Sequence, residues 1–415
     1  MIIKHISLDN YRSYGRLDLD VGPSVNIVYG NNAQGKTNLI EAINVCSCTA
    51  SHRTSTDREL VKIGEDGYSI KLLCHDEVYG NDTELQASYL LENTPKNSSN
   101  KPKRELYHDN MKIERISDYI GVCNTVIFAP EDLNLVKGSP SGRRKFFNML
   151  IIKVAPSYFN ILNGTNRILN QKNICIKSFK GKTENIDNNA LDFWDFSLAD
   201  MSADLIMYRY RFASLLSRKA AMHHSVISGG EENLSIQYMS LSGSTELLER
   251  SLKEDGMYDR FMEGRLSEGD LSGIKRILSD HILQKLQNSR KNDVEKGIST
   301  IGVHRDDLDI KLNGLSMRGF SSQGQQRSAS LSLKLAELEI IREMVSNSPV
   351  LLLDDVFSEL DAGRRTSLLA GMKEAQIFIT CTDRSYIENE LAAFLMTDVK
   401  PNYYRVENRT VLPEV

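Results

Sequence analysis

Several features that mark other classes of protein are scarce in this chain. It has 415 residues but only one Trp, and aromatic residues make up 7% of the sequence. No stretch approaches the roughly 20 consecutive apolar residues of a membrane-spanning helix. The N-terminal segment MIIKHISLDNYRSYG also lacks the apolar core of a signal peptide. The sequence therefore predicts a cytoplasmic protein without a membrane segment.

Cysteine is also sparse and provides no metal-binding framework. The six cysteines are scattered along the chain, and only Cys46 and Cys48 lie close together. A structural zinc site needs four ligands, commonly in two close pairs, and no second pair completes one here. We therefore interpret the cysteines as structural thiols in a reducing compartment.

An excess of positive charge is absent as well. There are 51 Lys and Arg residues against 55 Asp and Glu residues, which gives a net charge of −4. Because contacts to phosphates need clustered Lys and Arg, a DNA-binding site would have to be a local patch. Residues 101–104, 143–145 and 364–365 are short basic runs that could supply one, although such runs are more often ordinary solvated faces.

The length and the apolar periodicity predict two lobes, because 415 residues are too many for one compact core. Apolar runs typical of strands lie at residues 2–8, 17–21, 25–29, 68–73, 85–91, 126–129, 308–312, 350–353, 376–381 and 403–406. Between about residues 141 and 295, apolar side chains instead recur at helical spacing. We expect an α/β head from residues 1–140 and 296–415, and a mainly helical second lobe from residues 141–295. No heptad array is present, which excludes a long coiled coil.

A phosphate-binding loop lies between a predicted strand and a predicted helix. Residues 30–37, GNNAQGKT, satisfy the pattern G-x-x-x-x-G-K-[ST] in the strand–loop–helix context that the pattern requires. Its glycines let backbone N–H groups curl around phosphate oxygens, and the helix N-terminus favours the negative charge. We therefore predict that ATP binds at Gly30, Asn31, Asn32, Ala33, Gln34, Gly35, Lys36 and Thr37. In this prediction Lys36 neutralises the β- and γ-phosphates, and the Thr37 hydroxyl ligates Mg²⁺.

A second element supplies carboxylates. Residues 350–355, VLLLDD, place two aspartates at the end of a buried strand. Asp354 would hold the Mg²⁺ shell, and Asp355 would orient or deprotonate the attacking water. Such a pair can also merely cap a turn, but its combination with the phosphate-binding loop favours a catalytic role.

Two further segments narrow the class of enzyme. Residues 321–327, SSQGQQR, come just before a long predicted helix, and residues 358–361, SELD, follow the two aspartates. The first segment can form an anion-binding helix start, or Ser322 can be an ordinary N-cap. The order of the four elements is that of an ABC-type ATPase: Walker A, signature, Walker B and D-loop. A kinase or GTPase would have no role for a signature segment or a D-loop.

Seven motifs together resemble one family. They are NYRS at 10–13, YGNNAQGKT at 29–37, SHR at 51–53, PEDLNLVKGSPS at 130–141, VHRDD at 303–307, SQGQQR at 322–327 and LLDDVFSELD at 352–361. They span nearly the whole chain and are similar to those of the RecF family of bacterial DNA replication and repair proteins. The helical region is much less specific.

The resemblance implies an ABC-type head with a helical second lobe, ATP-dependent dimerisation and weak, DNA-dependent ATP hydrolysis that acts as a switch. It also implies binding to DNA, either duplex or a junction of single strand and duplex, and cooperation with RecR and RecO to load recombinase at gaps. Ser322 and Gly324 would contact the γ-phosphate bound by the opposite protomer. Glu131 or Asp132 would lie near the metal as the Q-loop side chain. The remaining implied nucleotide contacts are Arg12, Arg53, Gln325 and Asp361.

Three positions differ from the pattern found in ABC transporter subunits, and the differences help to choose between alternative functions. Gln323 and Gly324 replace a Gly-Gly pair, Asp355 replaces the usual Glu, and Thr382-Asp383 replaces the switch histidine. These changes and the large helical insertion argue against the energy subunit of a transporter. A plain P-loop phosphotransferase is the other alternative, and it would give no role to residues 321–326.

Overall fold

In the computed structural model of the chain, residues 1–92, 101–179, 188–345, 347–371, 375–385, 388 and 400–414 are described. They divide into two compact units. Unit 1 comprises Met1–Leu135, Met222–Glu232 and Ser322–Val415, and unit 2 comprises Val136–Ala221 and Asn233–Ser321. These boundaries differ from the predicted ones at 140 and 295. The strand expected at residues 308–312 pairs inside unit 2 instead of completing the head.

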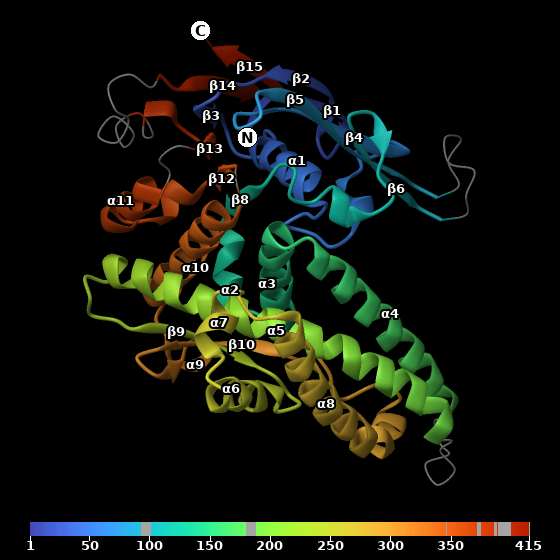
Figure 1. Cartoon of the computed structure of the whole chain (residues 1–415). Coiled ribbons are helices and arrows are strands. Elements are labelled where there is room, and N and C mark those ends of the chain that lie inside the picture. The colour runs from blue at the N-terminus through green and yellow to red at the C-terminus, as the bar shows by residue number, and fades with distance from the viewer. Residues whose placement is uncertain are drawn as a thin grey trace. The chain divides into compact units, whose positions relative to one another are not determined.

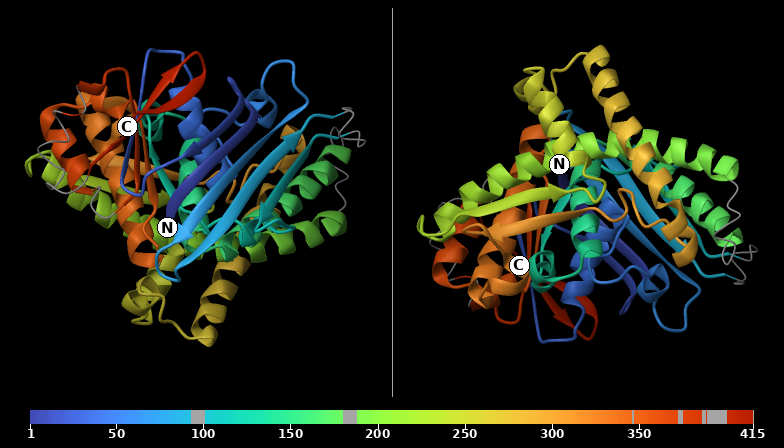
Figure 2. Two further views of the ribbon diagram at one scale, coloured as in Figure 1. Left: turned by 90° about the horizontal axis from the view of Figure 1, so that it is seen from above. Right: turned by 90° about the horizontal axis from the view of Figure 1, so that it is seen from below.

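Unit 1 contains an antiparallel sheet in the order β2-β1-β4-β5-β6-β7, whose longer strands lie side by side in Figure 2. The strands are β1 (Ile2–Tyr11), β2 (Tyr14–Asp20), β4 (Gly67–Asp76), β5 (Asn81–Leu90), β6 (Lys103–His108) and β7 (Met111–Lys112). Buried and partly exposed side chains alternate along β4 and β5. This alternation follows because one face packs on the core while the other meets solvent.

A second sheet in unit 1 has the order β15-β14-β3-β13-β12-β8. Its strands are β3 (Val25–Tyr29), β8 (Thr125–Phe128), β12 (Val350–Asp354), β13 (Ile377–Cys381), β14 (Asn402–Glu407) and β15 (Thr410–Glu414). All pairs are parallel except β14 with β15. Strands β12 and β13 are buried throughout, as is typical of parallel sheets. The carboxyl ends of β3, β13 and β12 therefore meet at one edge, where α/β proteins bind ligands.

Helix α1 (Lys36–Cys48) packs on strands of both sheets (Figure 1). Because both of its sides are covered, it is buried around most of its circumference, and Leu39, Ile40 and Ile43 are fully buried. The other long helices wholly in unit 1, α10 (Gln323–Met344) and α11 (Ala362–Gly371), pack on each other. Short 3-10 turns are η1 (Asp57–Leu60), η2 (Ile116–Asp118), η3 (Pro130–Asp132) and η4 (Val356–Glu359).

Unit 2 is mainly helical, as predicted. Its helices are α3 (Pro140–Val154), α4 (Ser157–Ser178), α6 (Ser244–Glu254), α7 (Tyr258–Met262), α8 (Glu268–Lys296) and α9 (Met317–Phe320). Helices α2 (Leu133–Lys137) and α5 (Asn188–Ile227) cross the boundary between the units. Among the helices described, none is long and apolar enough to span a membrane.

A small antiparallel sheet interrupts the helices of unit 2. It has the order β11-β10-β9 and is formed by β9 (Leu234–Met239), β10 (Asp307–Leu312) and β11 (Leu315–Ser316). Strand β9 was not predicted, although its buried residues Leu234, Ile236 and Tyr238 alternate with exposed ones. Such a run is too short to stand out between two long helical patterns.

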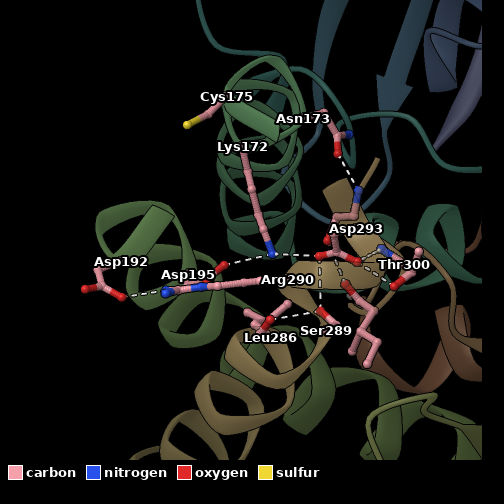
Figure 3. A network of polar contacts seen from close by, with 12 residues as sticks. Lys172, Asn173, Cys175, Asp192, Asp195, Leu286, Ser289, Arg290, Asp293 and Thr300 are labelled. Carbon is pink, nitrogen blue, oxygen red and sulfur yellow. Dashed lines mark hydrogen bonds and ion pairs between the residues drawn. The ribbon is translucent and has the colours of Figure 1, made fainter. Parts of the chain in front are cut away.

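Charged side chains form a buried network in unit 2 (Figure 3). The Lys172 Nζ atom on α4 lies 2.8 Å from Asp195 Oδ1 on α5 and 3.5 Å from Asp293 Oδ2 on α8. Arg290 on α8 forms a second ion pair with Asp195, at 2.8 Å. Burying an ion costs several kcal/mol unless a partner compensates it. The three helices must therefore pack where these charges meet.

Replacing Lys172 by Met should destabilise unit 2 strongly, because it leaves buried carboxylates facing each other without their shared cation. The expected loss in the free energy of unfolding is about 3–5 kcal/mol, measured by denaturant titration followed by circular dichroism. Lys253→Met is a matched control, because Lys253 pairs with Glu249 on the surface and its side chain is 61% exposed. Equal unfolding midpoints for the two variants would contradict a stabilising role for the network.

Candidate nucleotide-binding site

The loop of residues 30–37 connects β3 to α1, and two glycines set its path. Gly30 and Gly35 have φ angles of 147° and 118°, which side-chain-bearing residues rarely adopt. A Cβ atom at Gly30 would lie only 2.4 Å from the Val406 carbonyl oxygen. Within the loop, Asn31, Asn32 and Ala33 are exposed, whereas Gln34 is partly buried. The path of the loop thus depends on its glycines, and three of its residues are open to solvent.

Lys36 points back into this loop. Its Nζ atom donates to the carbonyl oxygens of Gly30 at 2.6 Å and of Asn31 at 3.0 Å. Burial lowers the pKa of Lys36, while the nearby charges of Asp355 and Asp354 oppose that shift. An ammonium group held among carbonyl oxygens in this way is well placed to neutralise a phosphate.

Asp354 and Thr37 are brought together at the edge of the parallel sheet. The Thr37 hydroxyl donates to Asp354 Oδ1 at 2.9 Å, and the Thr380 hydroxyl donates to the same oxygen at 2.8 Å. Burial raises the pKa of Asp354, and these two hydrogen bonds lower it in part. The site therefore presents one buried carboxylate and one hydroxyl, a pair of hard oxygens that suits Mg²⁺.

Asp355 is exposed and has a left-handed backbone, with φ of 52°. Its N–H donates to the Thr380 hydroxyl at 2.9 Å. The Ser358 hydroxyl donates to the Asp355 carbonyl oxygen at 2.8 Å and to Oδ1 at 3.2 Å. Strain of this kind persists only when neighbouring contacts enforce it. Here the contacts turn the second carboxylate out of the sheet, away from the buried position of Asp354.

A buried carboxylate, Glu41, organises the two arginines predicted to approach the nucleotide. Arg12 donates to both oxygens of Glu41, at 2.8 and 2.9 Å, and to the Glu59 carbonyl oxygen. Arg53 is held less tightly, 3.5 Å from Glu41 and 3.2 Å from the Asn38 side-chain oxygen. Burial alone would raise the pKa of Glu41, but the hydrogen bond from Arg12 keeps it below its usual value. Arg12 therefore braces the site, whereas Arg53, with its longer contacts, is the better candidate for a nucleotide contact.

The two residues considered for the Q-loop lie in η3 and differ in their surroundings. Glu131 is exposed, and its charge contributes to the raised pKa of Asp354. Asp132 instead accepts a hydrogen bond from the Ala129 N–H at 2.9 Å, and burial raises its pKa to about 6. Of the two, Glu131 is therefore the side chain available near the metal-binding oxygens.

The signature segment forms the start of α10. The Ser322 hydroxyl accepts from the Gln325 N–H at 3.2 Å, and the Gln325 side-chain oxygen accepts from the Ser322 N–H at 2.9 Å. This is a capping box, so Ser322 is the N-cap of the helix. The Gln325 amide also donates to Glu232 Oε1 at 2.8 Å, and the other Glu232 oxygen lies 3.0 Å from His224. The Glu232 side chain, which lies outside the signature segment, thus holds Gln325 of that segment in place.

The comparisons with known proteins agree with this geometry. The RecF/RecN/SMC N terminal domain family matches residues 2–403. The DNA replication and repair protein RecF of Ruminiclostridium cellulolyticum is 36% identical over 393 residues, which cover 95% of this chain and 96% of that one. RecF of Bacillus cereus is 39% identical over 94% of each chain. The chain belongs to the RecF family. It is therefore a member of a family of DNA replication and repair proteins with an ABC/SMC-type ATPase head.

Solved RecF structures have the same fold. The recombination mediator protein RecF-ATP of the RecFOR pathway matches 100% of this chain and 98% of its own, with a TM-score of 0.82 and 30% identity. The RecF-ATPrS structure matches with a TM-score of 0.80. An Smc head bound to the C-winged helix domain of ScpA matches at 12% identity and a TM-score of 0.50, which shows a shared fold alone. The predicted ABC-type head with a mainly helical second lobe is confirmed.

Some basic residues weighed as DNA contacts are used within the fold of this RecF family member. Arg143 is buried and pairs with Asp307 at 2.9 Å. Arg104 donates to the Thr49 carbonyl oxygen at 2.7 Å and pairs with Asp57. Within the run 143–145, Arg143 is therefore neither a solvated surface residue nor available to DNA, because its ion pair holds it inside unit 2.

Sequence reasoning missed several residues around the RecF-type site. Glu41 looked like one polar residue in an apolar helix, and Thr380 looked like part of a buried strand. Glu232 belongs to none of the recognised motifs, and its partner His224 is fully buried. The strand pairing of Asp354 with Thr380 could have identified Thr380, but that register is not visible in the sequence.

The residues present fit ATP with Mg²⁺. A Cβ atom at Gly35 would come within 3.0 Å of Ser13 and Tyr14, so the loop needs glycine to keep its curvature. Among the described residues, no group of three His, Cys, Asp or Glu side chains could hold a metal. A Mg²⁺ ion bound with ATP commonly uses one or two protein oxygens and takes its other ligands from phosphates and water.

Thr380→Val should slow ATP turnover by about 10- to 100-fold, the usual cost of removing a partner that orients a metal ligand. The variant keeps the side-chain shape but removes the donor to Asp354 and the acceptor of the Asp355 N–H. Binding of a fluorescent ATP analogue should change much less, because the phosphate-binding loop is intact. Thr410→Val, at an exposed position of β15, is the control. If Thr380→Val releases phosphate at the wild-type rate, Thr380 has no role in orienting Asp354 for ATP turnover.

Proposed function

We propose that this chain is an ATP-gated DNA-binding protein of recombinational repair and replication restart. Two copies sandwich two ATP molecules, and the dimer binds DNA at gaps or junctions of single strand and duplex. It helps to load recombinase there, and slow, DNA-dependent ATP hydrolysis resets it. The proposal rests on the family membership and on the placement of the four ATPase motifs in unit 1.

The incomplete nucleotide site carries the dimer proposal. Walker A and Walker B join through the hydrogen bond from Thr37 to Asp354. In contrast, the described side-chain hydrogen bonds of Ser322 and Gln325 go to each other and to Glu232, and none reaches residues 30–37. A signature segment that does not serve its own phosphate-binding loop is suited to complete the loop of a second copy. On this basis Ser322, Gly324, Gln325 and Asp361 act in trans.

The hydrolytic roles follow from the oxygens at the sheet edge. Thr37 and Asp354 would hold Mg²⁺, with Glu131 nearby, and the bound ion would neutralise charge on the phosphates. Lys36 binds the β- and γ-phosphates. Asp355, exposed beside the buried Asp354, orients the attacking water and accepts its proton. Arg53 would contact the phosphates, and Arg12 supports it through Glu41.

The partners proposed are DNA, RecR and RecO. The RecF structure that this chain resembles is described as a mediator of the RecFOR pathway, and the net charge of −4 requires any DNA contact to be local. A clamp that closes with ATP would create such a patch by bringing basic residues of two copies together. DNA affinity should then depend on the nucleotide.

The dimer is tested by sedimentation velocity at micromolar protein with ATP, with ADP and without nucleotide. We expect a monomer without nucleotide and a dimer with ATP, because the signature segment needs a phosphate-bound partner. Lys36→Ala is the matched control and should stay monomeric in ATP. Identical monomer profiles for wild type in all three conditions would refute the sandwich.

Asp355→Asn should bind ATP and dimerise but hydrolyse ATP about 10²- to 10⁴-fold more slowly, the range expected for losing a general base. Turnover is measured by phosphate release with and without DNA, and dimerisation by sedimentation. Because Asp355 is exposed, the substitution should leave folding unchanged. Turnover equal to wild type would exclude Asp355 from the mechanism.

DNA gating is tested by titrating duplex and junction DNA with ATP, ADP and no nucleotide at two salt concentrations. Affinity should be highest with ATP, and the slope of log affinity against log salt should fall by about 0.9 for each phosphate contact. Anionic vesicles serve as the control for a transporter-like role, and they should not stimulate hydrolysis. Equal DNA affinity in all three nucleotide conditions would argue against gating.

A further inference from the structure

One guanidinium group joins the signature segment to the D-loop. Arg364 lies in the first turn of α11, and its Nη2 atom donates to the Gly324 carbonyl oxygen at 2.9 Å. Its Nε atom donates to the Ser328 hydroxyl at 3.0 Å, one turn further along α10. Its Nη1 atom forms an ion pair with the Asp361 carboxylate. All three side-chain nitrogens are therefore engaged.

The chemistry of arginine suits this bridge. A guanidinium is planar and presents its donors in a rigid fork, so partners on different sides are held at a fixed separation. A lysine ammonium could pair with Asp361, but it could not also hold a carbonyl and a hydroxyl in one plane.

The exposure of the bridge differs between its two ends. The Asp361 side chain is 58% exposed, whereas that of Arg364 is 20% exposed. Asp361 also accepts a hydrogen bond from the Arg364 N–H at 3.0 Å, which fixes the start of α11. The arginine is therefore positioned beneath the carboxylate and the signature segment rather than offered to solvent. This placement argues against Arg364 as a simple DNA contact.

We propose that Arg364 is a positioning residue that makes the signature segment and the D-loop engage a second copy of this chain as one unit. The inference rests on the proposed ATP-dependent dimer, since both motifs would act on the partner's nucleotide. With Arg364 in place, a shift of α10 at Gly324 must move Asp361 too. Without it, each motif would find its position independently, and the closed dimer would lose more conformational freedom when it forms.

The test compares Arg364→Gln, Arg364→Lys, Asp361→Asn and the double variant Asp361→Asn/Arg364→Gln. Arg16→Gln is the charge-matched control, because Arg16 is 80% exposed on β2 and pairs with Asp18. Three quantities are measured: binding of a fluorescent ATP analogue, the dimer dissociation constant in ATP, and the rate of phosphate release. Thermal unfolding of each variant verifies that it is folded.

We expect ATP binding within about twofold of wild type, because the phosphate-binding loop is untouched, but a dimer weakened about tenfold in Arg364→Gln. Arg364→Lys should be intermediate, since it keeps only the ion pair. The dimer dissociation constant of the double variant should be no larger than that of the more strongly affected single variant. The reason is that the effects of residues that act as a unit are not additive. If Arg364→Gln does not fold, Arg364→Lys and Asp361→Asn still test the same coupling.

Two results would overturn the inference in distinguishable ways. If wild type dimerises with ATP and Arg364→Gln does so equally well, Arg364 has no positioning role, while the proposed function stands. Additive effects in the double variant lead to the same conclusion. If wild type itself does not dimerise with ATP, the proposed function fails, and this inference fails with it.

Discussion

The hydrogen bond between Thr37 and Asp354 joins residues that are 317 positions apart, and the nucleotide site depends on it. It forms because β3 and β12 are separated by a single strand, β13, and all three run parallel. Their carboxyl ends therefore meet at one edge. The loop after β3 brings the groups that we propose to bind phosphate, and the end of β12 brings the carboxylates. Strand β13 adds Thr380, which ties Asp354 and the backbone of Asp355 to the same point.

Much of the remaining precision comes from charged residues outside the recognisable motifs. Glu41 on α1 is fully buried and holds Arg12 with two hydrogen bonds. Glu232 holds Gln325, and Arg364 holds Gly324 and Asp361. In each case, a residue without a proposed role in binding or hydrolysis holds a residue of a functional motif in position. Such support matters because misplacement by about 1 Å can cost two orders of magnitude in rate.

Unit 2 uses buried charge for a different purpose. Lys172, Asp195 and Asp293 come from three helices and meet where no solvent reaches them. An apolar cluster of the same size could stabilise these helices as well, but it would tolerate many alternative packings. Ion pairs compensate their desolvation only when all partners are present. We interpret the network as a device that selects one packing of α4, α5 and α8.

The sequence by itself determined the fold class, most strands of the head and the residues of Walker A and Walker B. These features are local: a strand that ends at Gly30, a helix that begins at Lys36 and a buried strand that ends at Asp354 all leave short-range patterns. Only the tertiary structure decided that Thr380 and Glu41 belong to the site, that Arg143 is buried and that β10 pairs within unit 2. It also revealed the bridge made by Arg364. The physical reason is that burial and hydrogen bonding of a charged side chain depend on strand order and helix packing, which join residues far apart in the chain.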